Sequence, residues 1–278
     1  MEYQILDSGY FKKLEQVGPF LLERPAPGAI WRPRLEKDVW AKVDAKFTRF
    51  SGGHGKWTKI NRSMPAQWSI SIEGLKFQIE MTDFGHLGIF PEHLSCLTKV
   101  QAPIREAKHP FKVLNLFAYT GWASIALARA GAEVTHVDAS KTSVAWARKN
   151  AELNGLDQAP IRWIVDDVRK FCEREKRRGV RYDGIILDPP SFGRGVKGEV
   201  WKIERDLIPL LDLLSEIKND SAYILLSSHS AGHTPLALEN LLKDFSPSSL
   251  ESDEMALMSE TGIPLPSGGY AFGSWNLG

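Results

Sequence analysis

From residue 112 onward, short apolar segments of strand length alternate with segments of helical periodicity, and this alternation constrains the fold most strongly. The expected strands lie at 113–117, 133–138, 161–165, 182–188 and 222–228. Helices are expected after them, at 124–132, 142–154, 168–178, 204–217 and 235–245, and two extended stretches follow at 250–258 and 269–275. The alternation indicates βαβ units with right-handed crossovers. We therefore expect an α/β fold with a doubly wound, mainly parallel seven-stranded sheet. Pro209 inside the helix at 204–217 predicts a kink or a later start.

The first part of the chain has a different pattern, in which short alternating stretches are separated by Gly, Pro and Trp residues. Residues 68–81 alternate apolar and polar side chains around Glu73-Gly74, a signal for a two-residue hairpin. We expect a smaller β-rich N-terminal segment over residues 1–84, with few helices, and a Rossmann-like domain over residues 85–278.

Residues 32–62 are strongly basic, with nine Lys or Arg against three acids, although the whole chain has a net charge of only +1. Five aromatic residues are interleaved: Trp31, Trp40, Phe47, Phe50 and Trp57. Basic groups neutralise phosphates and aromatic faces stack on unpaired bases, which favours RNA binding by the N-terminal segment. A solvated charged face with its aromatic side chains turned inward explains the pattern equally well.

Other features exclude several classes of protein. Cys96 and Cys172 each stand alone, without a second Cys or a His at metal-ligand spacing, so neither a disulfide nor a metal site is expected. No apolar run approaches the roughly 18 residues that cross a bilayer, and the N-terminal residues lack a signal-peptide pattern. We expect a cytoplasmic protein without a membrane partner, and the oligomeric state stays open.

Ligand-type residues stand where the expected strands end, and in doubly wound sheets ligands bind outside these carboxyl ends. Small residues surround Gly121 after the first strand, which lets backbone N–H groups approach a ligand. The dinucleotide fingerprint G-x-G-x-x-G is absent, so a pyrophosphate is disfavoured. Asp138 suits the hydroxyls of a ribose, and one acid of Asp166-Asp167 can accept from adenine while the other caps a helix. The inferred ligand has a ribose and an adenine but no phosphate.

Four segments, VLNLFAYTG, HVDAS, VDDV and LDPPSF, together resemble the motifs of class I S-adenosylmethionine-dependent methyltransferases. The resemblance covers roughly residues 80–275 and is closest to bacterial large-subunit ribosomal RNA methyltransferases of the cytosine/guanine type. It implies S-adenosylmethionine as the cofactor, with its ribose on Asp138 and its adenine near Asp167. The implied cofactor-binding residues are Phe90, Asn115, Phe117, Ala118, Tyr119, Thr120, Gly121, Asp138, Ala139, Asp166, Asp167 and Asp188. The segment 85–93 resembles the family's segment that folds against the cofactor, where Glu92 and His93 can also line the pocket.

The segment Asp188-Pro189-Pro190 follows the fourth expected strand and predicts the catalytic turn. An exocyclic amino nitrogen is a poor nucleophile because its lone pair is delocalised into the base. Asp188 and the carbonyl of Pro189 can accept both of its hydrogens, and prolines donate no N–H in return. Phe192 can stack on a flipped base. The predicted catalytic residues are therefore Asp188, Pro189 and Phe192.

Ser191 departs from amino-methylating enzymes, in which an aromatic residue directly follows the two prolines. The same departure occurs in relatives that methylate cytosine C5, and those need a nucleophilic cysteine near the end of the fifth strand. This chain has LLSSHSAGH at 225–233, and serine does not replace a thiolate there. C5 chemistry is therefore disfavoured. His229 is either a base, an RNA contact or an ordinary loop residue.

Three functions are compatible with these patterns. The leading hypothesis is a methyltransferase that acts on a base nitrogen of RNA, with ribosomal RNA as the partner. A small molecule or a protein is the alternative substrate, which the modest net charge allows. A non-catalytic RNA-binding relative is the third possibility, and the intact Asp138 and Asp188-Pro189-Pro190 argue against it.

Overall fold

The computed structural model describes residues 2–50, 54–195 and 198–277. The chain forms two compact units. The N-terminal unit comprises Met1–Glu92 and Ala256–Ser267, and the α/β unit comprises His93–Met255 and Gly268–Gly278. This division differs from the expected boundary at 84/85. The first unit extends to Glu92 and also includes Ala256–Ser267 from the last part of the chain. Ile5 forms a parallel bridge with Ser259, and the Glu260 N–H donates to the Ile5 carbonyl.

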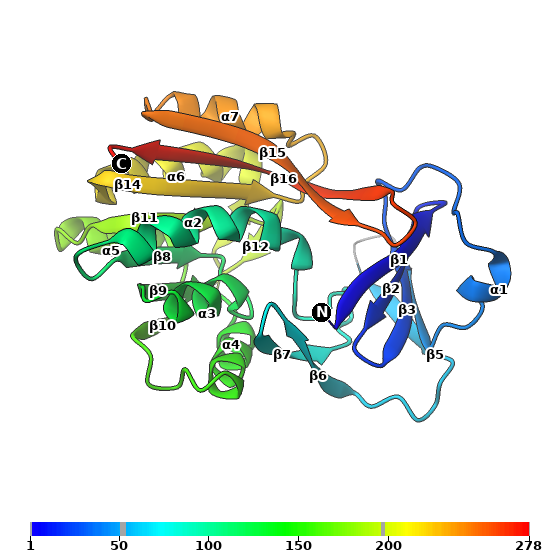
Figure 1. Ribbon diagram of the computed structural model, residues 1–278. Coiled ribbons are helices and arrows are strands. Elements are labelled where there is room, and N and C mark those ends of the chain that lie inside the picture. The colour runs from blue at the N-terminus through cyan, green and yellow to red at the C-terminus, as the bar shows by residue number, and fades with distance from the viewer. Residues whose placement is uncertain (1, 51–53, 196–197, 278) are drawn as a thin grey trace. The chain divides into compact units, whose positions relative to one another are not determined.

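The α/β unit contains a seven-stranded sheet in the order β10-β9-β8-β11-β14-β16-β15 (Figure 1). Its strands are β8 (Lys112–Leu116), β9 (Glu133–Asp138), β10 (Ile161–Val165), β11 (Tyr182–Leu187), β14 (Lys218–Ser228), β15 (Ser249–Met258) and β16 (Pro264–Trp275). The five strands from β10 to β14 are mutually parallel, whereas β16 runs antiparallel to β14. The doubly wound, mainly parallel sheet predicted from the alternation is confirmed.

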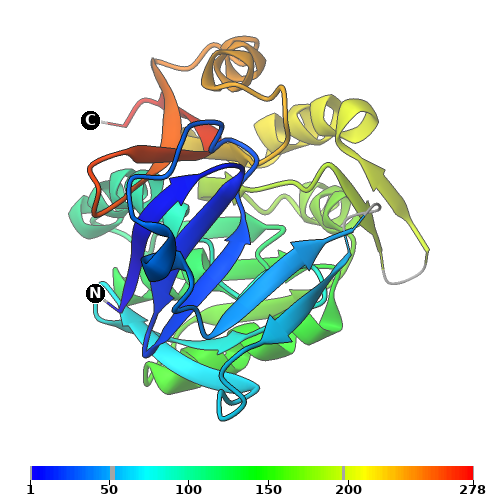
Figure 2. The same cartoon turned by 90° about the vertical axis from the view of Figure 1, so that its right-hand side faces the viewer.

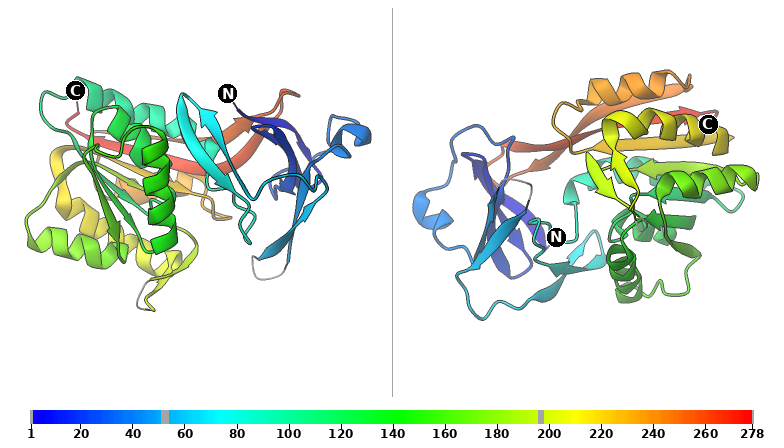
Figure 3. Two further views of the ribbon diagram at one scale, coloured as in Figure 1. Left: turned by 90° about the horizontal axis from the view of Figure 1, so that it is seen from below. Right: turned by 180° about the vertical axis from the view of Figure 1, so that it is seen from behind.

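Helices cover both faces of this sheet (Figure 3). They are α2 (Leu94–Glu106), α3 (Trp122–Arg129), α4 (Lys141–Leu153), α5 (Val168–Arg177), α6 (Ile203–Ile217) and α7 (Pro235–Lys243). Apolar side chains of α5, α6 and α7 share one buried cluster with alternate residues of β8, β11 and β14, such as Leu114, Ile185 and Ile224. Helices α2, α3 and α4 pack as neighbours on the other face. Burial of the apolar stripe of each helix is the main source of this packing.

Two helices differ from the sequence-based expectation. Helix α6 begins at Ile203 and contains Pro209 as an interior residue, so the later start expected from this proline is wrong. Helix α2 was not predicted, although its buried residues Cys96, Leu97, Val100 and Ile104 follow a helical spacing. Pro103 near its end weakens that signal, because a proline interrupts helical hydrogen bonding.

The N-terminal unit contains a five-stranded sheet in the order β1-β2-β3-β4-β5 (Figure 2). Its strands are β1 (Tyr3–Gly9), β2 (Lys12–Val17), β3 (Phe20–Pro25), β4 (Ala45–Arg49) and β5 (Gly55–Lys59), with the one-turn helix α1 (Lys37–Trp40) before β4. All pairs are antiparallel except β3 with β4. The predicted hairpin is present as β6 (Gln67–Ile72) and β7 (Leu75–Glu80), with φ of 49° at Glu73 and 71° at Gly74. The β-rich character of this segment is therefore confirmed.

Candidate active site at the carboxyl edge of the sheet

Three neighbouring strands end in register at one edge of the sheet in the α/β unit. Leu116 of β8 pairs with Val137 of β9 on one side and with Leu187 of β11 on the other. The next residue of each strand is therefore Phe117, Asp138 or Asp188. This register explains why the sequence predicts a shared site for residues that are far apart in the chain.

The loop from Phe117 to Gly121 turns tightly between β8 and α3. Phe117 and Tyr119 have positive φ angles of 55° and 47°, an uncommon and strained conformation for residues other than glycine. The Ala118 N–H donates to the Val137 carbonyl at 3.1 Å, which ties the loop to β9. Gly121 has a φ of 87°, and a Cβ there would lie 2.9 Å from the Cβ of Ala147. Only glycine therefore allows this close approach of the loop to α4.

Asp138 is held by backbone donors at the end of β9. Its Oδ2 accepts from the Tyr119 N–H at 2.9 Å, and its Oδ1 accepts from the Ser140 N–H at 2.8 Å. Burial raises the pKa of this carboxyl, and the two backbone bonds only partly offset the effect. Each carboxylate oxygen has a second acceptor position, so Asp138 can also receive the two hydroxyls of a ribose. The residues present therefore fit an adenosine-type cofactor.

Hydrogen bonds between buried polar side chains lie next to the loop from Phe117 to Gly121. The Asn115 amide donates to Ser124 Oγ at 2.9 Å, and this oxygen lies 2.9 Å from Nδ1 of His136. The Asn150 amide donates to the Thr120 carbonyl at 3.0 Å. Burial lowers the pKa of His136 to about 3, so the imidazole is neutral. Asn115 and Thr120 are 4% and 1% exposed, and their contacts with the cofactor stay predictions.

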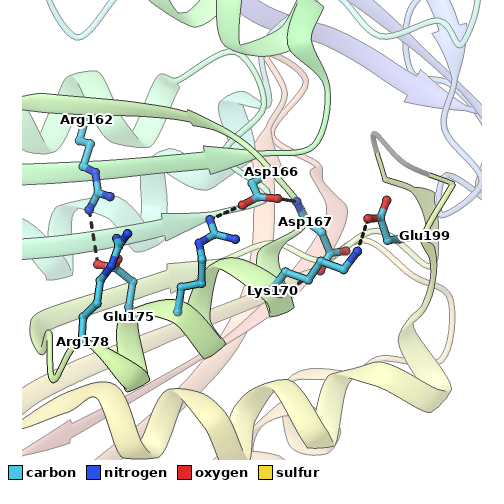
Figure 4. Close-up of polar contacts among 8 residues, drawn as sticks. Arg162, Asp166, Asp167, Lys170, Glu175, Arg178 and Glu199 are labelled. Atoms are coloured by element: carbon cyan, nitrogen blue, oxygen red, sulfur yellow. Dashed lines mark hydrogen bonds and ion pairs between the residues drawn. The ribbon is translucent and has the colours of Figure 1, made fainter.

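Asp166 and Asp167 lie at the start of α5, after β10 (Figure 4). Asp167 caps the helix, because its Oδ1 accepts from the Lys170 N–H at 3.0 Å. Asp166 accepts from the Asp167 N–H at 2.9 Å and forms an ion pair with Arg174. The sequence suggested that one of the two acids caps the helix, and that acid is Asp167. The resemblance places the same residue near the adenine. Cofactor binding by either acid remains a prediction.

Asp188 is held by side chains from distant segments. Its Oδ1 accepts from Ser227 Oγ at 2.9 Å. Its Oδ2 lies 3.4 Å from Nε2 of His93 and 3.4 Å from Nε2 of His229. Burial by itself would raise the pKa of this carboxyl, but the two imidazoles outweigh burial and hold it well below its usual range. Asp188 is therefore an ionised acceptor at the edge of the sheet.

The turn after Asp188 is joined to the loop after β8. Trp201 packs on Phe117, with ring centroids 4.8 Å apart, and its indole N–H donates to the Pro190 carbonyl at 2.7 Å. The Ile203 N–H donates to the Ser191 carbonyl at 3.1 Å. Phe192 begins the short strand β12 (Phe192–Arg194), which pairs with β13 (Val200–Lys202), and it is 52% exposed. An exposed ring is available for stacking, as the prediction requires.

The sequence only partly identified this site. His93, Ser227 and His229 surround Asp188, yet His93 was named only as a pocket-lining residue and His229 was left between three roles. Position along the chain could have indicated these residues, because His93 directly precedes α2 and Ser227 and His229 lie at the end of β14 and just after it. Phe90 belongs to the N-terminal unit, where its ring packs edge-on against His86 at 5.3 Å. Ala139 follows Asp138 directly, and its role as a cofactor ligand stays a prediction.

Both cysteines are buried, which makes their thiols poor nucleophiles. Cys172 is buried on α5, and burial raises the pKa of its thiol far above the usual range. Cys96 lies in the first turn of α2, three residues after His93. It is buried, and its thiol donates to the His93 carbonyl at 3.2 Å.

Together, the parallel sheet, the tight loop after β8 and the acid at the end of β9 define an S-adenosylmethionine-dependent methyltransferase. A family model described as S-adenosylmethionine-dependent methyltransferase matches residues 56–228. The chain belongs to this family, and its cofactor is S-adenosylmethionine. In the described part of the chain, no helix is long and apolar enough to span a membrane.

Among similar proteins, a ribosomal RNA large subunit methyltransferase K/L of Alteromonas mediterranea is 32% identical over 223 residues. The match covers 80% of this chain and 29% of that protein. A protein of the same name from Pseudoalteromonas atlantica is 38% identical over 161 residues, which cover 57% of this chain and 22% of that one. The chain thus spans less than a third of the length of these curated relatives.

A solved structure of a SAM-dependent methyltransferase from Agrobacterium tumefaciens matches almost the whole chain. Its TM-score is 0.93 at 38% sequence identity, and the match covers 99% of this chain and 90% of that one.

Proposed function

We propose that this protein transfers a methyl group from S-adenosylmethionine to an exocyclic amino nitrogen of a base in ribosomal RNA. The observation that carries the proposal is Asp188, an ionised carboxylate directly followed by two prolines at the end of β11. Relatives that share 31–38% identity with this chain are named as ribosomal RNA large subunit methyltransferases, which supports RNA as the substrate. Ribosomal RNA as substrate also favours a cytoplasmic location.

The turn supplies acceptors for both hydrogens of the amino group. Asp188 Oδ2 accepts one hydrogen, and the carbonyl of Pro189 accepts the other. The carbonyls of Pro190 and Ser191 are already engaged by Trp201 and Ile203. Two acceptors in fixed positions localise the nitrogen lone pair and orient it for in-line attack. The bound cofactor supplies the electrophilic methyl group.

The proton released from the methylated nitrogen needs an acceptor near Asp188. Nε2 of His93 and Nε2 of His229 each lie 3.4 Å from the carboxylate oxygen that faces the amino group. An unprotonated imidazole at this distance can take the proton after the carboxylate has received it. Phe192 stacks on the base that carries the amino group.

The environments of the cysteines argue against methylation at cytosine C5. That reaction needs a thiolate that attacks the ring, and the thiolate rather than the thiol is the nucleophile. Cys96 and Cys172 are both buried, and they are the two cysteines of the chain. A nitrogen atom of the base is therefore the favoured methyl acceptor.

The basic stretch of the N-terminal unit supports RNA binding through phosphates. Arg49 and Lys56 lie on the paired strands β4 and β5, and both are exposed. Most of the neighbouring aromatic side chains face inward, with the exception of Phe50, which is 55% exposed. Trp40 donates to Asp7 Oδ2 at 3.1 Å, Trp57 donates to the Thr82 carbonyl at 2.9 Å, and Phe47 is buried. We therefore assign RNA-backbone binding, rather than base stacking, to this unit.

Methyl transfer from labelled S-adenosylmethionine to total RNA tests the proposal. RNA from cells that lack the gene is methylated in vitro, digested to nucleosides and separated. Label in an N-methylated base supports the proposal and names the atom. Label in 5-methylcytosine overturns the argument from the cysteines. An unlabelled RNA pool, with cofactor binding intact by calorimetry, rejects RNA as the substrate.

Charge reversal tests the role of the N-terminal unit. R49E/K56E should weaken RNA binding and reduce its salt dependence, because each lost phosphate contact removes about one released counterion. R105E/K108E is the matched control, since both residues are exposed and basic, with Arg105 in the last turn of α2 and Lys108 shortly after the helix. Equal RNA affinity for the two double variants would reject the assignment.

A further inference from the structure

His93, Asp188 and His229 bring three potential metal ligands together within the α/β unit. One ligand atom from each residue lies within 4.8 Å of the other two. The residues come from three separate segments, namely the residue before α2, the turn after β11 and the loop after β14. Two imidazoles and one carboxylate form a ligand set that transition-metal ions prefer.

The distances within this cluster match those of a tetrahedral metal site. Nε2 of His93 lies 3.3 Å from Nε2 of His229, and each nitrogen lies 3.4 Å from Asp188 Oδ2. In a tetrahedral zinc site with bonds of about 2.0–2.1 Å, neighbouring ligand atoms are about 3.3–3.4 Å apart. The three atoms thus form one face of such a tetrahedron. All three can bind one ion with little movement.

The surroundings of the cluster also suit a bound ion. Ser227 Oγ donates to Asp188 Oδ1 at 2.9 Å, which leaves Oδ2 directed at the two imidazoles. Such a partner behind a metal-binding carboxylate fixes its orientation. The side chains of His93, Asp188 and His229 are 18%, 23% and 28% exposed, so an ion has access from solvent. With three protein ligands, the fourth position is open to water.

We propose that His93, Asp188 and His229 bind one divalent transition-metal ion, with Zn²⁺ as the best match in geometry and ligand type. The site requires deprotonated ligands, so metal binding should release protons. The proposal reverses the sequence-based expectation that the chain has no metal site. That expectation rested on spacing along the chain, whereas these ligands meet only in the folded unit.

A bound ion would occupy the groups that the proposed methyl transfer uses. Asp188 Oδ2 would no longer accept a hydrogen from the substrate, and both Nε2 atoms would be unable to accept a proton. We therefore expect the ion to inhibit methyl transfer. This consequence rests on the proposed function, whereas metal binding itself does not.

Titration of tag-free protein with Zn²⁺, followed by calorimetry and by competition with a chromogenic chelator, tests the site directly. Wild-type protein should bind one ion per chain. Loss of an outer-shell partner typically weakens metal binding roughly 10- to 100-fold, and S227A should weaken it by such a factor. H93Q and H229Q each remove a direct ligand, so each should weaken binding by more than this factor. H109Q is the matched control, because His109 is an exposed histidine outside the cluster.

Cobalt(II) provides a second measurement that does not depend on activity. Protein loaded with Co²⁺ should show the intense visible absorption of a tetrahedral site, and H229Q should lose it while retaining its circular dichroism spectrum. Absence of stoichiometric binding by the wild type, or equal affinity in H93Q, H229Q and H109Q, would overturn the proposal. Stoichiometric metal binding by a protein whose metal-free form transfers no methyl group would reject the proposed function and leave the metal site standing.

Discussion

Two carboxylates lie at the ends of β9 and β11, on either side of β8 in the same sheet, yet their surroundings are opposite. Asp138 receives only backbone N–H groups, from Tyr119 and Ser140, and burial raises its pKa. Asp188 is surrounded by side chains, and its pKa is lowered in spite of burial, by His93 and His229. The backbone donors fix a binding group in one position. The side-chain partners create a charged group whose proton affinity can change during a reaction.

The comparison predicts that the largest effect on catalysis comes from Asp188. D188N keeps the shape of the side chain but replaces an anionic acceptor by an amide. Methyl transfer should fall by roughly 10²–10³-fold, as for other single groups that stabilise a transition state. The dissociation constant of S-adenosylmethionine should remain near the wild-type value. Single-turnover transfer and calorimetry measure the two quantities, and an unchanged rate would show that Asp188 has no catalytic part.

Asp138 should show the reverse behaviour. D138A removes the acceptor for the ribose hydroxyls together with the partner of two backbone N–H groups. Hydrogen bonds to charged groups contribute about 1.5–3 kcal/mol, so cofactor affinity should fall about 10- to 100-fold or more. D157A, which changes an exposed aspartate, is the control. If both variants bind the cofactor alike by calorimetry, Asp138 is not a ligand.

The buried imidazole near Asp138 makes stability depend on pH. His136 has a pKa of about 3 in the folded protein, far below the ordinary value of 6.5, because it is buried. Below pH 6.5 the unfolded chain therefore binds a proton that the folded chain does not. The unfolding free energy should fall by about 1.4 kcal/mol per pH unit between pH 6.5 and 3, and this contribution should be constant above pH 6.5.

Urea unfolding at several pH values measures this dependence. H136Q retains a polar side chain that cannot become charged, so it should show a shallower decline below pH 6.5. The same slope in both proteins would place the titrating group elsewhere. Asp188 should lower stability in the same direction, because its pKa is also lowered on folding, but only below the ordinary aspartate pKa of about 3.9.

The smallest expected effect comes from Ser227. S227A removes the 2.9 Å hydrogen bond to Asp188 Oδ1 but leaves the two imidazoles next to Oδ2. A single hydrogen bond contributes about 0.5–1.5 kcal/mol, so the transfer rate should fall about two- to tenfold. S215A on the exposed surface of α6 is the control. A loss as large as that of D188N would mean that Ser227 has a more direct role.

The same two carboxylates show how far the sequence could predict the site. The partners of Asp138 lie 19 and 2 residues away, within a βαβ pattern that the sequence reveals. Ser227 lies 39 residues from Asp188 and His93 lies still further away on the other side, so their meeting depends on the strand order. The order is a property of the whole sheet. Local periodicity therefore predicted where the strands end but not which side chains surround Asp188.

The N-terminal unit was harder to predict for the same physical reason. Its hairpin at Glu73-Gly74 has a local turn signal and was predicted. The parallel pairing of β3 with β4 joins strands across a long connection that carries α1 and the first part of the basic stretch. No turn signal marks such a pairing. The aromatic side chains of that connection donate hydrogen bonds into the unit, which composition alone could not distinguish from exposed stacking surfaces.

Strands β15 and β16 impose an order of events on biosynthesis. The N-terminal unit includes Ala256–Ser267, which the ribosome adds only after almost all of the α/β unit. At about 5–20 residues per second, the first 92 residues wait roughly ten to thirty seconds for that segment. The nascent N-terminal unit is thus unfinished during most of translation. A gene split between Glu92 and His93 would leave the N-terminal fragment without Ala256–Ser267, whereas the second fragment would carry every residue of the α/β unit. The first fragment should therefore complete its unit only when the second is supplied with it.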